Sequence, residues 1–232
     1  QFGDVGVLLN LDHSRSIADV ADPAADDDPE LVLDALTAGP EGIRVLLAPS
    51  SPELADLVTP AHLRTVMLEL RRSFDFIVVD TASHLGELNL EAIELATRVI
   101  VVTMLSIPAV KNTRLTLRVL ESLSVVPERI LVALNCSDAR SDLTREAVEA
   151  NLRFPIAVQI PHDPALVDGS VNHGIAFVTT GPETAISRSI RELATRLVPE
   201  GRPAAALAQA GVSAQRRSRL FGARRHASGQ TG

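Results

Sequence analysis

The chain has 232 residues, a formal net charge of −7, 46% hydrophobic residues and a single cysteine. A chain of this length buries about 70% of the surface that its unfolded form exposes, so disorder as the main state is excluded. The lone Cys136 excludes an internal disulfide, and the sequence has neither a signal peptide nor a run of about 20 apolar residues. We therefore expect a soluble, cytoplasmic protein.

The charge is distributed unevenly along the chain. Residues 199–232 carry six arginines and one glutamate, which leaves a net charge of −12 on residues 1–198. The tail has little hydrophobic periodicity and is rich in Ala, Gly, Gln and Ser. We predict a folded acidic domain over 1–198 and a flexible basic tail over 199–232. An acidic body disfavours broad nucleic-acid binding.

Short runs rich in valine and isoleucine alternate with segments that have apolar residues at helical spacing. Because the runs are continuous, they are typical of strands buried on both faces of a parallel sheet. We predict strands at 5–9, 43–47, 76–79, 99–103, 130–134 and 156–160. We predict helices at 31–37, 60–72, 88–96, 108–123, 141–152 and 183–197. This order predicts an α/β fold with a doubly wound, mainly parallel sheet, helices on both faces and predicted strands that all point one way.

Ligands of parallel α/β sheets bind at the carboxyl ends of the strands, so the residues that follow each run are the candidate site. Asp80 ends the sequence Phe-Asp-Phe-Ile-Val-Val-Asp. Four apolar residues followed by an acid have the form of a Walker B strand, whose carboxylate holds the water shell of a nucleotide-bound Mg²⁺ ion. The alternative is an aspartate that merely ends a strand or caps the next helix.

Two further candidates follow later strands. Asn135 comes directly after 130–134, and an asparagine amide both donates and accepts hydrogen bonds at an adenine edge, although it also forms turns. Pro161, His162 and Asp163 follow 156–160 and form a rigid turn whose backbone faces a base, or an ordinary loop before a helix.

Other chemistries have little support in the sequence. His62 and His84 have no second ligand at metal spacing, and Cys136 has no histidine nearby, so zinc and a cysteine nucleophile are disfavoured. The motifs G-x-S-x-G, CxxC and HExxH are absent, and so is a glycine-rich G-K-[ST] phosphate loop.

Six blocks in this order resemble the MinD/ParA ATPases with a deviant Walker A motif, and within them the CpaE/TadZ branch that localises Tad-type pilus assembly. The resemblance covers the chain from Gln1 to about residue 197. The blocks are QFGDV (1–5), LADLVTP (54–60), IVVDT (77–81), IPAVKNT (107–113), the strand that ends in Asn135, and IPHD (160–163) followed by NHG (172–174).

The resemblance implies that Asp80 has the catalytic, Mg²⁺-associated Walker B role, while Asn135, Pro161, His162 and Asp163 flank the adenine of ATP. It implies a nucleotide-switched homodimer that positions a Tad-type pilus or secretion machine. Because the sequence begins with Gln1 and has no phosphate loop, we expect that loop and its Asp-x-Asp pair upstream, and this fragment to be inactive by itself.

The sequence departs from the family pattern at two site positions. Ala82 stands where a proline is common after the Walker B aspartate, and Cys136 stands where an arginine usually follows the adenine-binding asparagine. A non-catalytic localisation scaffold is therefore an alternative. A ParA-type partitioning ATPase is another, which the acidic body disfavours.

The basic tail suggests a membrane contact. Residues 216–225, RRSRLFGARR, place Leu220 and Phe221 among five arginines, and resemble the basic amphipathic ends by which some MinD proteins touch anionic membrane. We expect peripheral contact at the inner face of the cell membrane, or alternatively a flexible solubilising tail.

Overall fold

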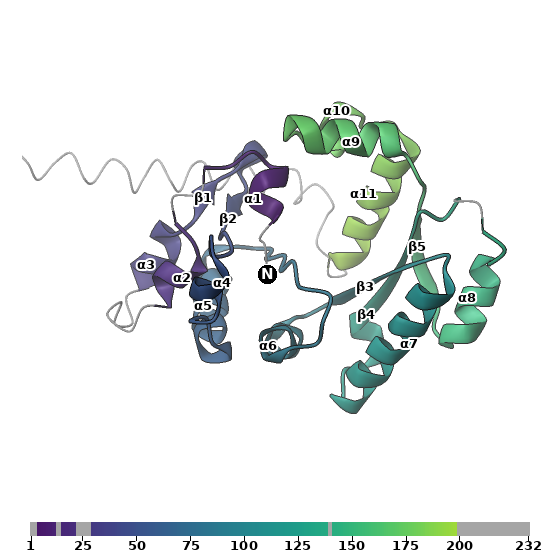
Figure 1. The fold of residues 1–232 in the computed structure, drawn as a ribbon, viewed down its shortest axis with the longest axis horizontal. Coiled ribbons are helices and arrows are strands. Elements are labelled where there is room, and N and C mark those ends of the chain that lie inside the picture. Colours follow the sequence, from purple (N-terminus) through teal and green to yellow (C-terminus); the bar gives the residue numbers. More distant parts are fainter. Residues whose placement is uncertain (1–3, 13–14, 22–28, 139–140, 199–232) are drawn as a thin grey trace, which may run out of the picture. The chain divides into compact units, whose positions relative to one another are not determined.

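The computed structural model describes residues 4–12, 15–21, 29–138 and 141–198 (Figure 1). The chain divides into two compact units, with the boundary between Leu88 and Asn89. Each unit is described by itself below. The predicted basic tail lies outside the described residues, and the predicted domain over 1–198 stays a prediction.

The first unit is built from short helices and one small hairpin. Its core forms where α5 packs against α3, through Val66 and Leu70 of α5 and Val32 of α3. The Thr59 hydroxyl caps α5 by accepting from the His62 N–H at 3.3 Å. The elements are α1 (Asp4–Leu8), α2 (Ile17–Val20), α3 (Pro29–Asp34), β1 (Thr37–Ala38), η2 (Pro40–Gly42), β2 (Arg44–Val45), α4 (Pro52–Ala55) and α5 (Pro60–Ser73).

All three strand predictions in this unit are wrong, and the first two are at 5–9 and 43–47. Residues 5–8 lie in α1 instead, and the Leu9 N–H donates to the Val5 carbonyl at 3.1 Å, so the backbone is satisfied locally. Residues 43–47 contribute only the two-residue β2, which pairs antiparallel with β1 across η2. The prediction that all strands point one way is therefore also wrong, because a hairpin this short reverses the chain.

The predicted Walker B strand at 76–79 is not a strand in the structure. The segment is extended, with Ile77 packed against the core of the first unit and Val78 86% exposed. A strand needs a neighbouring backbone to accept and donate its hydrogen bonds, and residues 76–79 take part in no strand pairing over the described residues. Apolar composition alone predicted the extended conformation but not the pairing.

The second unit follows the predicted alternation closely. The strands at 99–103, 130–134 and 156–160 are confirmed, and α9 and α10 were not predicted. The prediction that a helix begins at Ser141 is wrong, because Thr144 caps α8 by accepting from the Ala147 N–H at 3.2 Å. The elements are α6 (Glu87–Leu95), which begins at the end of the first unit, β3 (Val99–Met104), α7 (Ile107–Ser122), η3 (Pro127–Arg129), β4 (Ile130–Asn135), α8 (Arg145–Leu152), β5 (Ile156–Ile160), α9 (Pro164–His173), α10 (Phe177–Thr180) and α11 (Ala185–Leu197).

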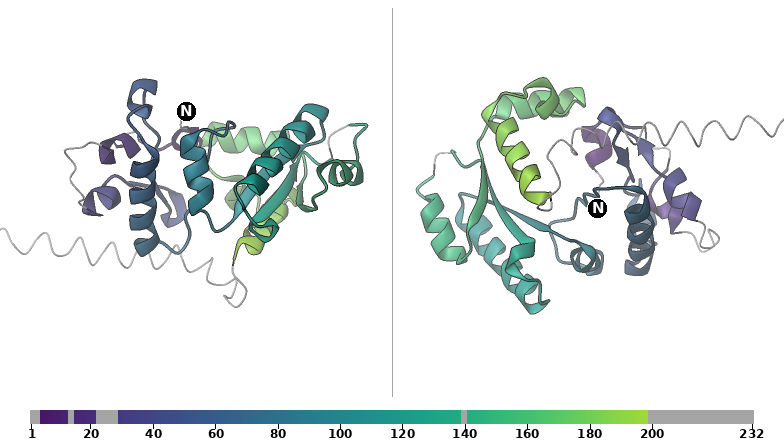
Figure 2. Two further views of the ribbon diagram at one scale, coloured as in Figure 1. Left: turned by 90° about the horizontal axis from the view of Figure 1, so that it is seen from below. Right: turned by 180° about the vertical axis from the view of Figure 1, so that it is seen from behind.

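The sheet of the second unit is parallel, with the order β3-β4-β5. Helices α7 and α8 lie on one face, and α9, α10 and α11 on the other (Figure 2). Leu120 of α7, Val148 of α8 and Leu134 of β4 are buried together on the first face. On the second face Ile186 of α11 packs against Ala133 of β4. The predicted α/β fold with helices on both faces of a parallel sheet is therefore confirmed.

Strand β3 is an edge of this sheet and is covered on one face. Val101 and Thr103 are buried, whereas Ile100, Val102 and Met104 are 37%, 58% and 45% exposed. The continuous run VIVVTM had predicted burial on both faces. This prediction is wrong for β3, because α9, α10 and α11 pack over β4 and β5 and leave its second face bare.

We predict that Leu120→Ala lowers the free energy of unfolding by about 2–5 kcal/mol, because Leu120 is fully buried and the truncation leaves a cavity. Leu115→Ala, on the exposed side of the same helix, is the control and changes it by less than about 1 kcal/mol. Urea unfolding followed by circular dichroism measures both. Equal losses would contradict the packing of α7 described above.

Candidate functional site

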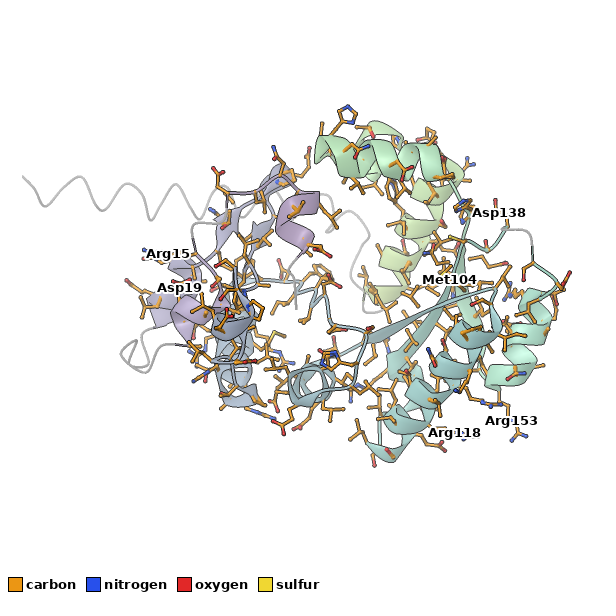
Figure 3. The ribbon with its side chains drawn as sticks, viewed as in Figure 1. Arg15, Asp19, Met104, Arg118, Asp138 and Arg153 are labelled. Carbon is orange, nitrogen blue, oxygen red and sulfur yellow. The ribbon has the colours of Figure 1, made fainter. Side chains whose placement is uncertain are left out.

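The strand register brings the predicted site residues of the second unit to one edge. Asn135 is the partner of Met104 on β3 and of Ile160 on β5. Since Pro161 follows Ile160 directly, the end of β4 and the turn after β5 lie next to each other. Figure 3 shows Asp138 and Met104 toward the carboxyl ends of the strands. We call the edge formed by Asn135–Asp138 and residues 161–163 the carboxyl rim.

The turn after β4 is held by the backbone of its neighbour. The Cys136 N–H donates to the Asn135 side-chain carbonyl at 3.0 Å, and the Ser137 N–H donates to the Ile160 carbonyl at 3.0 Å. Cys136 has a φ of 50°, in the left-handed region that non-glycine residues adopt infrequently. The Asn135 amide nitrogen donates no hydrogen bond within the described part of the chain. It therefore remains available as a donor at the rim.

Asp138 is a rim residue that the sequence analysis missed. Its Oδ1 accepts from the His162 N–H at 2.5 Å, which joins the loop after β4 to the turn after β5. A carboxylate that accepts from a backbone N–H makes a charge-assisted bond, stronger than a neutral one. The sequence did contain a signal for Asp138, because an aspartate three residues after the end of a strand commonly accepts hydrogen bonds from nearby backbone N–H groups.

Of the three predicted turn residues, Asp163 has a structural role already. Its Oδ1 accepts from the Leu166 N–H at 3.2 Å and caps α9, whose first turn contains Pro164. Pro161 is half-buried, and the His162 side chain is exposed. The turn therefore presents its backbone and the His162 ring toward the surface, while the Asp163 carboxylate is occupied by the helix.

The rim continues to the end of β3. The Ser141 hydroxyl donates to the Leu105 carbonyl at 2.9 Å, so the loop after β4 is tied to both neighbouring strands. Thr103 is 1% exposed, and its hydroxyl has no partner over the described residues. An unpaired buried hydroxyl costs free energy, and such groups are rare in native structures.

Asp80 belongs to the first unit and is exposed. Its proximity to Asn135 therefore stays a prediction. Within the described ranges, no group of three or more His, Cys, Asp or Glu side chains is placed to hold a metal ion. Mg²⁺ retains much of its water shell and takes only one or two carboxylates together with phosphate oxygens, so a single exposed carboxylate fits a metal brought by a nucleotide and not a resident metal centre.

No family model matches the chain. Over 163 residues it is 27% identical to the septum site-determining protein MinD of Thermotoga maritima, an alignment that covers 68% of this chain and 59% of that protein. The chain therefore spans less than two thirds of the length of this relative.

Solved structures share the fold. A ParA family ATPase from Chlorobium tepidum has a TM-score of 0.78 at 21% identity, with 85% of this chain and 82% of that one covered. MinD of Pyrococcus horikoshii, solved with Mg-ADP, has a TM-score of 0.69 at 25% identity, with 84% and 78% covered. The MinC:MinD complex of Aquifex aeolicus has a TM-score of 0.69 at 20% identity, with 88% and 81% covered.

The parallel sheet flanked by helices is thus the α/β architecture of the P-loop NTPases. More narrowly, the chain has the fold of the MinD/ParA deviant Walker A ATPases, and its relatives include MinD. None of the helices formed by the described residues has both the length and the apolar character needed to cross a membrane.

We predict that Asp138→Ala increases hydrogen exchange at the His162 amide by about tenfold, because the amide loses its acceptor and a hydrogen bond to a charged group is worth about 1.5 kcal/mol or more. Asp138→Asn keeps an oxygen acceptor and is the matched control, with a smaller increase. Exchange measured by NMR or mass spectrometry on both variants decides the outcome. An unchanged His162 amide in Asp138→Ala would contradict the role assigned to this carboxylate.

Proposed function

We propose that the chain is part of an ATP-dependent factor of the CpaE/TadZ type that positions or assembles a Tad-type pilus or secretion machine. In this proposal the whole protein works as a homodimer switched by nucleotide. The chain spans 59% of the MinD relative, so the activity of the whole protein is part of the proposal.

The carboxyl rim is the observation that supports nucleotide binding most directly. Adenine presents ring-nitrogen acceptors and an exocyclic amine donor. The Asn135 amide nitrogen is unoccupied, and its carbonyl oxygen retains a second lone pair beside the one used by Cys136. The turn of Pro161, His162 and Asp163 is held against it by Asp138. We propose that adenine lies between these two loops.

Asp80 is proposed to act on the metal that accompanies the nucleotide. When bound, Mg²⁺ neutralises charge on the phosphates, and an exposed carboxylate such as Asp80 orients water in the metal's shell. The relative from Pyrococcus horikoshii was solved with Mg-ADP, which supports an adenine nucleotide and Mg²⁺ as the ligands proposed for this protein.

The phosphate-binding loop is proposed to come from sequence outside this chain. The chain contains no G-K-[ST] motif, and Lys111, its one lysine, lies in the first turns of α7 rather than in a glycine-rich turn. The bare face of β3 supports the proposal, because the exposed side chains of Ile100, Val102 and Met104 form an apolar strip that a further element would cover.

The pilus or secretion machinery is the proposed partner. This part of the proposal rests on the resemblance of the blocks at 54–60, 107–113 and 172–174 to the CpaE/TadZ branch. Membrane contact through residues 216–225 belongs to the same proposal and concerns residues outside the described part.

A non-catalytic scaffold is the second candidate, favoured by two departures of the sequence from the family pattern. Cys136 follows Asn135 in place of an arginine, so the adenine site lacks one cationic contact. Ala82 follows the Asp80-Thr81 pair in place of a proline, which leaves the backbone after the carboxylate less constrained. Weaker nucleotide binding in the whole protein would favour this candidate.

We predict that the chain printed here binds ATP weakly, and that a form extended through the adjoining coding sequence binds ATP in an Mg²⁺-dependent way. In the extended form, Asp80→Ala weakens Mg²⁺-ATP binding about tenfold or more, because the metal loses its protein anchor. Titration with a fluorescent ATP analogue, with and without Mg²⁺, measures both effects.

Asp56→Asn is the control, since it removes an exposed carboxylate from the same unit. Tight ATP binding by the present chain, or an Asp80→Ala variant that binds like Asp56→Asn, would overturn the proposal. Mg²⁺-dependent binding without ATP hydrolysis would favour the scaffold.

A further inference from the structure

A second site candidate lies at the amino ends of the strands of the second unit, opposite the carboxyl rim. A groove of about 440 Å³ is bounded by the residues that precede β4 and β5. Its floor is mainly apolar, and its rim carries one arginine and one glutamate. The lining residues are Pro127, Glu128, Ile130, Arg153, Phe154 and Pro155.

Two arginines lie on the helix that leads toward this groove. Arg114 and Arg118 are four residues apart on one exposed face of α7. The Arg114 guanidinium donates to the Asn151 side-chain carbonyl at 3.3 Å, so this face adjoins the last turn of α8. Figure 3 shows Arg118 and Arg153 at the same end of α7 and α8.

These cations are not neutralised by the nearby carboxylates. Arg118 and Arg153 have no ion pair among the described residues. The Glu149 carboxylate is already occupied, because it accepts from the Ile156 N–H at 2.8 Å and pairs with Arg145 at 3.2 Å. The hydrogen bond from Ile156 lowers the pKa of Glu149, despite some desolvation.

Glu128 is the one acid of the groove, and a third arginine lies beside it. The Arg98 guanidinium donates to the Glu128 backbone carbonyl. Arg98 and Arg153 therefore outnumber Glu128 at the groove, and Arg118 lies on the neighbouring helix α7. The protein as a whole has a net charge of −7, so this local excess of positive charge is opposite in sign to the charge of the whole protein.

We propose that this groove, with Arg153 at its rim and Arg118 beside it, binds an acidic peptide segment of a partner protein that carries one aromatic or branched apolar side chain. The apolar side chain would pack on Phe154, Pro155 and Ile130, and its flanking carboxylates would pair with Arg153 and Arg118. The proposal does not depend on nucleotide binding at the carboxyl rim.

The observations favour a peptide over other anionic partners. A nucleic acid would meet the acidic body of the protein and gain little from an apolar floor with two prolines. A membrane surface would need a broader cationic face and apolar side chains that project outward. A shallow, open groove with a mainly apolar floor and Arg153 at its edge suits one side chain with charged neighbours.

Arg153 permits an unusually clean test. It ends α8 in the left-handed conformation, with a φ of 53° and a ψ of 35°, where glycine is the favoured residue. Arg153→Gly therefore removes the cation and the side chain at the groove while relaxing the backbone. We expect this variant to be at least as stable as the parent in urea unfolding.

The test uses fluorescence polarisation of the full chain with a labelled peptide Asp-Asp-Glu-Phe-Asp-Glu. We expect saturable binding that weakens about tenfold in Arg153→Gly and in Arg118→Glu. The same peptide with Ser in place of Phe should bind about fivefold more weakly. Arg72→Gln, which removes an exposed arginine from the first unit, is the control for net charge and should bind like the parent.

A 20-base-pair DNA duplex and vesicles of anionic phosphatidylglycerol are the competing probes. The proposal is overturned if the Phe peptide does not saturate at 1 mM, if Arg153→Gly binds like the parent, or if the Ser peptide binds equally well. It is also overturned if DNA or vesicles bind more tightly than the peptide with the same sensitivity to Arg153→Gly.

Discussion

The parallel pairing of β4 with β3 and β5 is the constraint on which the second unit depends. Because parallel strands require crossover helices, each strand sends a helix back along one face of the sheet. The register places Asn135 opposite both Met104 and Ile160. A hydrogen bond from the Ser137 N–H to the Ile160 carbonyl then holds the loop that follows β4 against the end of β5. A slip of one residue would move Asn135 away from Pro161 and turn the buried side chains of β4 to the wrong faces.

The same register makes the two ends of the sheet chemically different. At the carboxyl ends, Asn135 and Asp138 supply polar groups that bond to neighbouring loops or remain free. At the amino ends, Pro127 precedes β4 and Pro155 precedes β5. Both prolines line a mainly apolar groove that has Arg153 at its rim. Helices α7 and α8 start near one end and finish near the other, with Ser106 and Thr144 capping their first turns and Arg153 ending α8.

Several blocks that carry the family resemblance are helix boundaries in the structure. Thr59 caps α5, Ser106 caps α7 ahead of Pro108, and Gly174 ends α9 with a φ of 66°. A cap hydroxyl, a proline in the first turn and a glycine in the left-handed region are required by the backbone whatever the protein binds. These blocks therefore carry strong information about the fold and less about the partner that separates one branch from another.

The sequence by itself determined the three strands of the second unit and several of its helices, because strands such as 130–134 are long apolar runs and helices such as α7 have clear caps and periodicity. It did not predict α9 and α10. It also predicted that Asn135 and the turn at 161–163 lie at one edge, since the residues after parallel strands share an edge. Tertiary structure decided which segments pair as strands and which faces of the sheet are covered. Residues 5–9 became a helix, 76–79 formed no strand, and one face of β3 remained bare, although all three runs are apolar. The role of Asp138 and the groove beside Arg153 likewise arise from segments distant in the sequence, whose contacts depend on the register of the sheet and not on any local pattern.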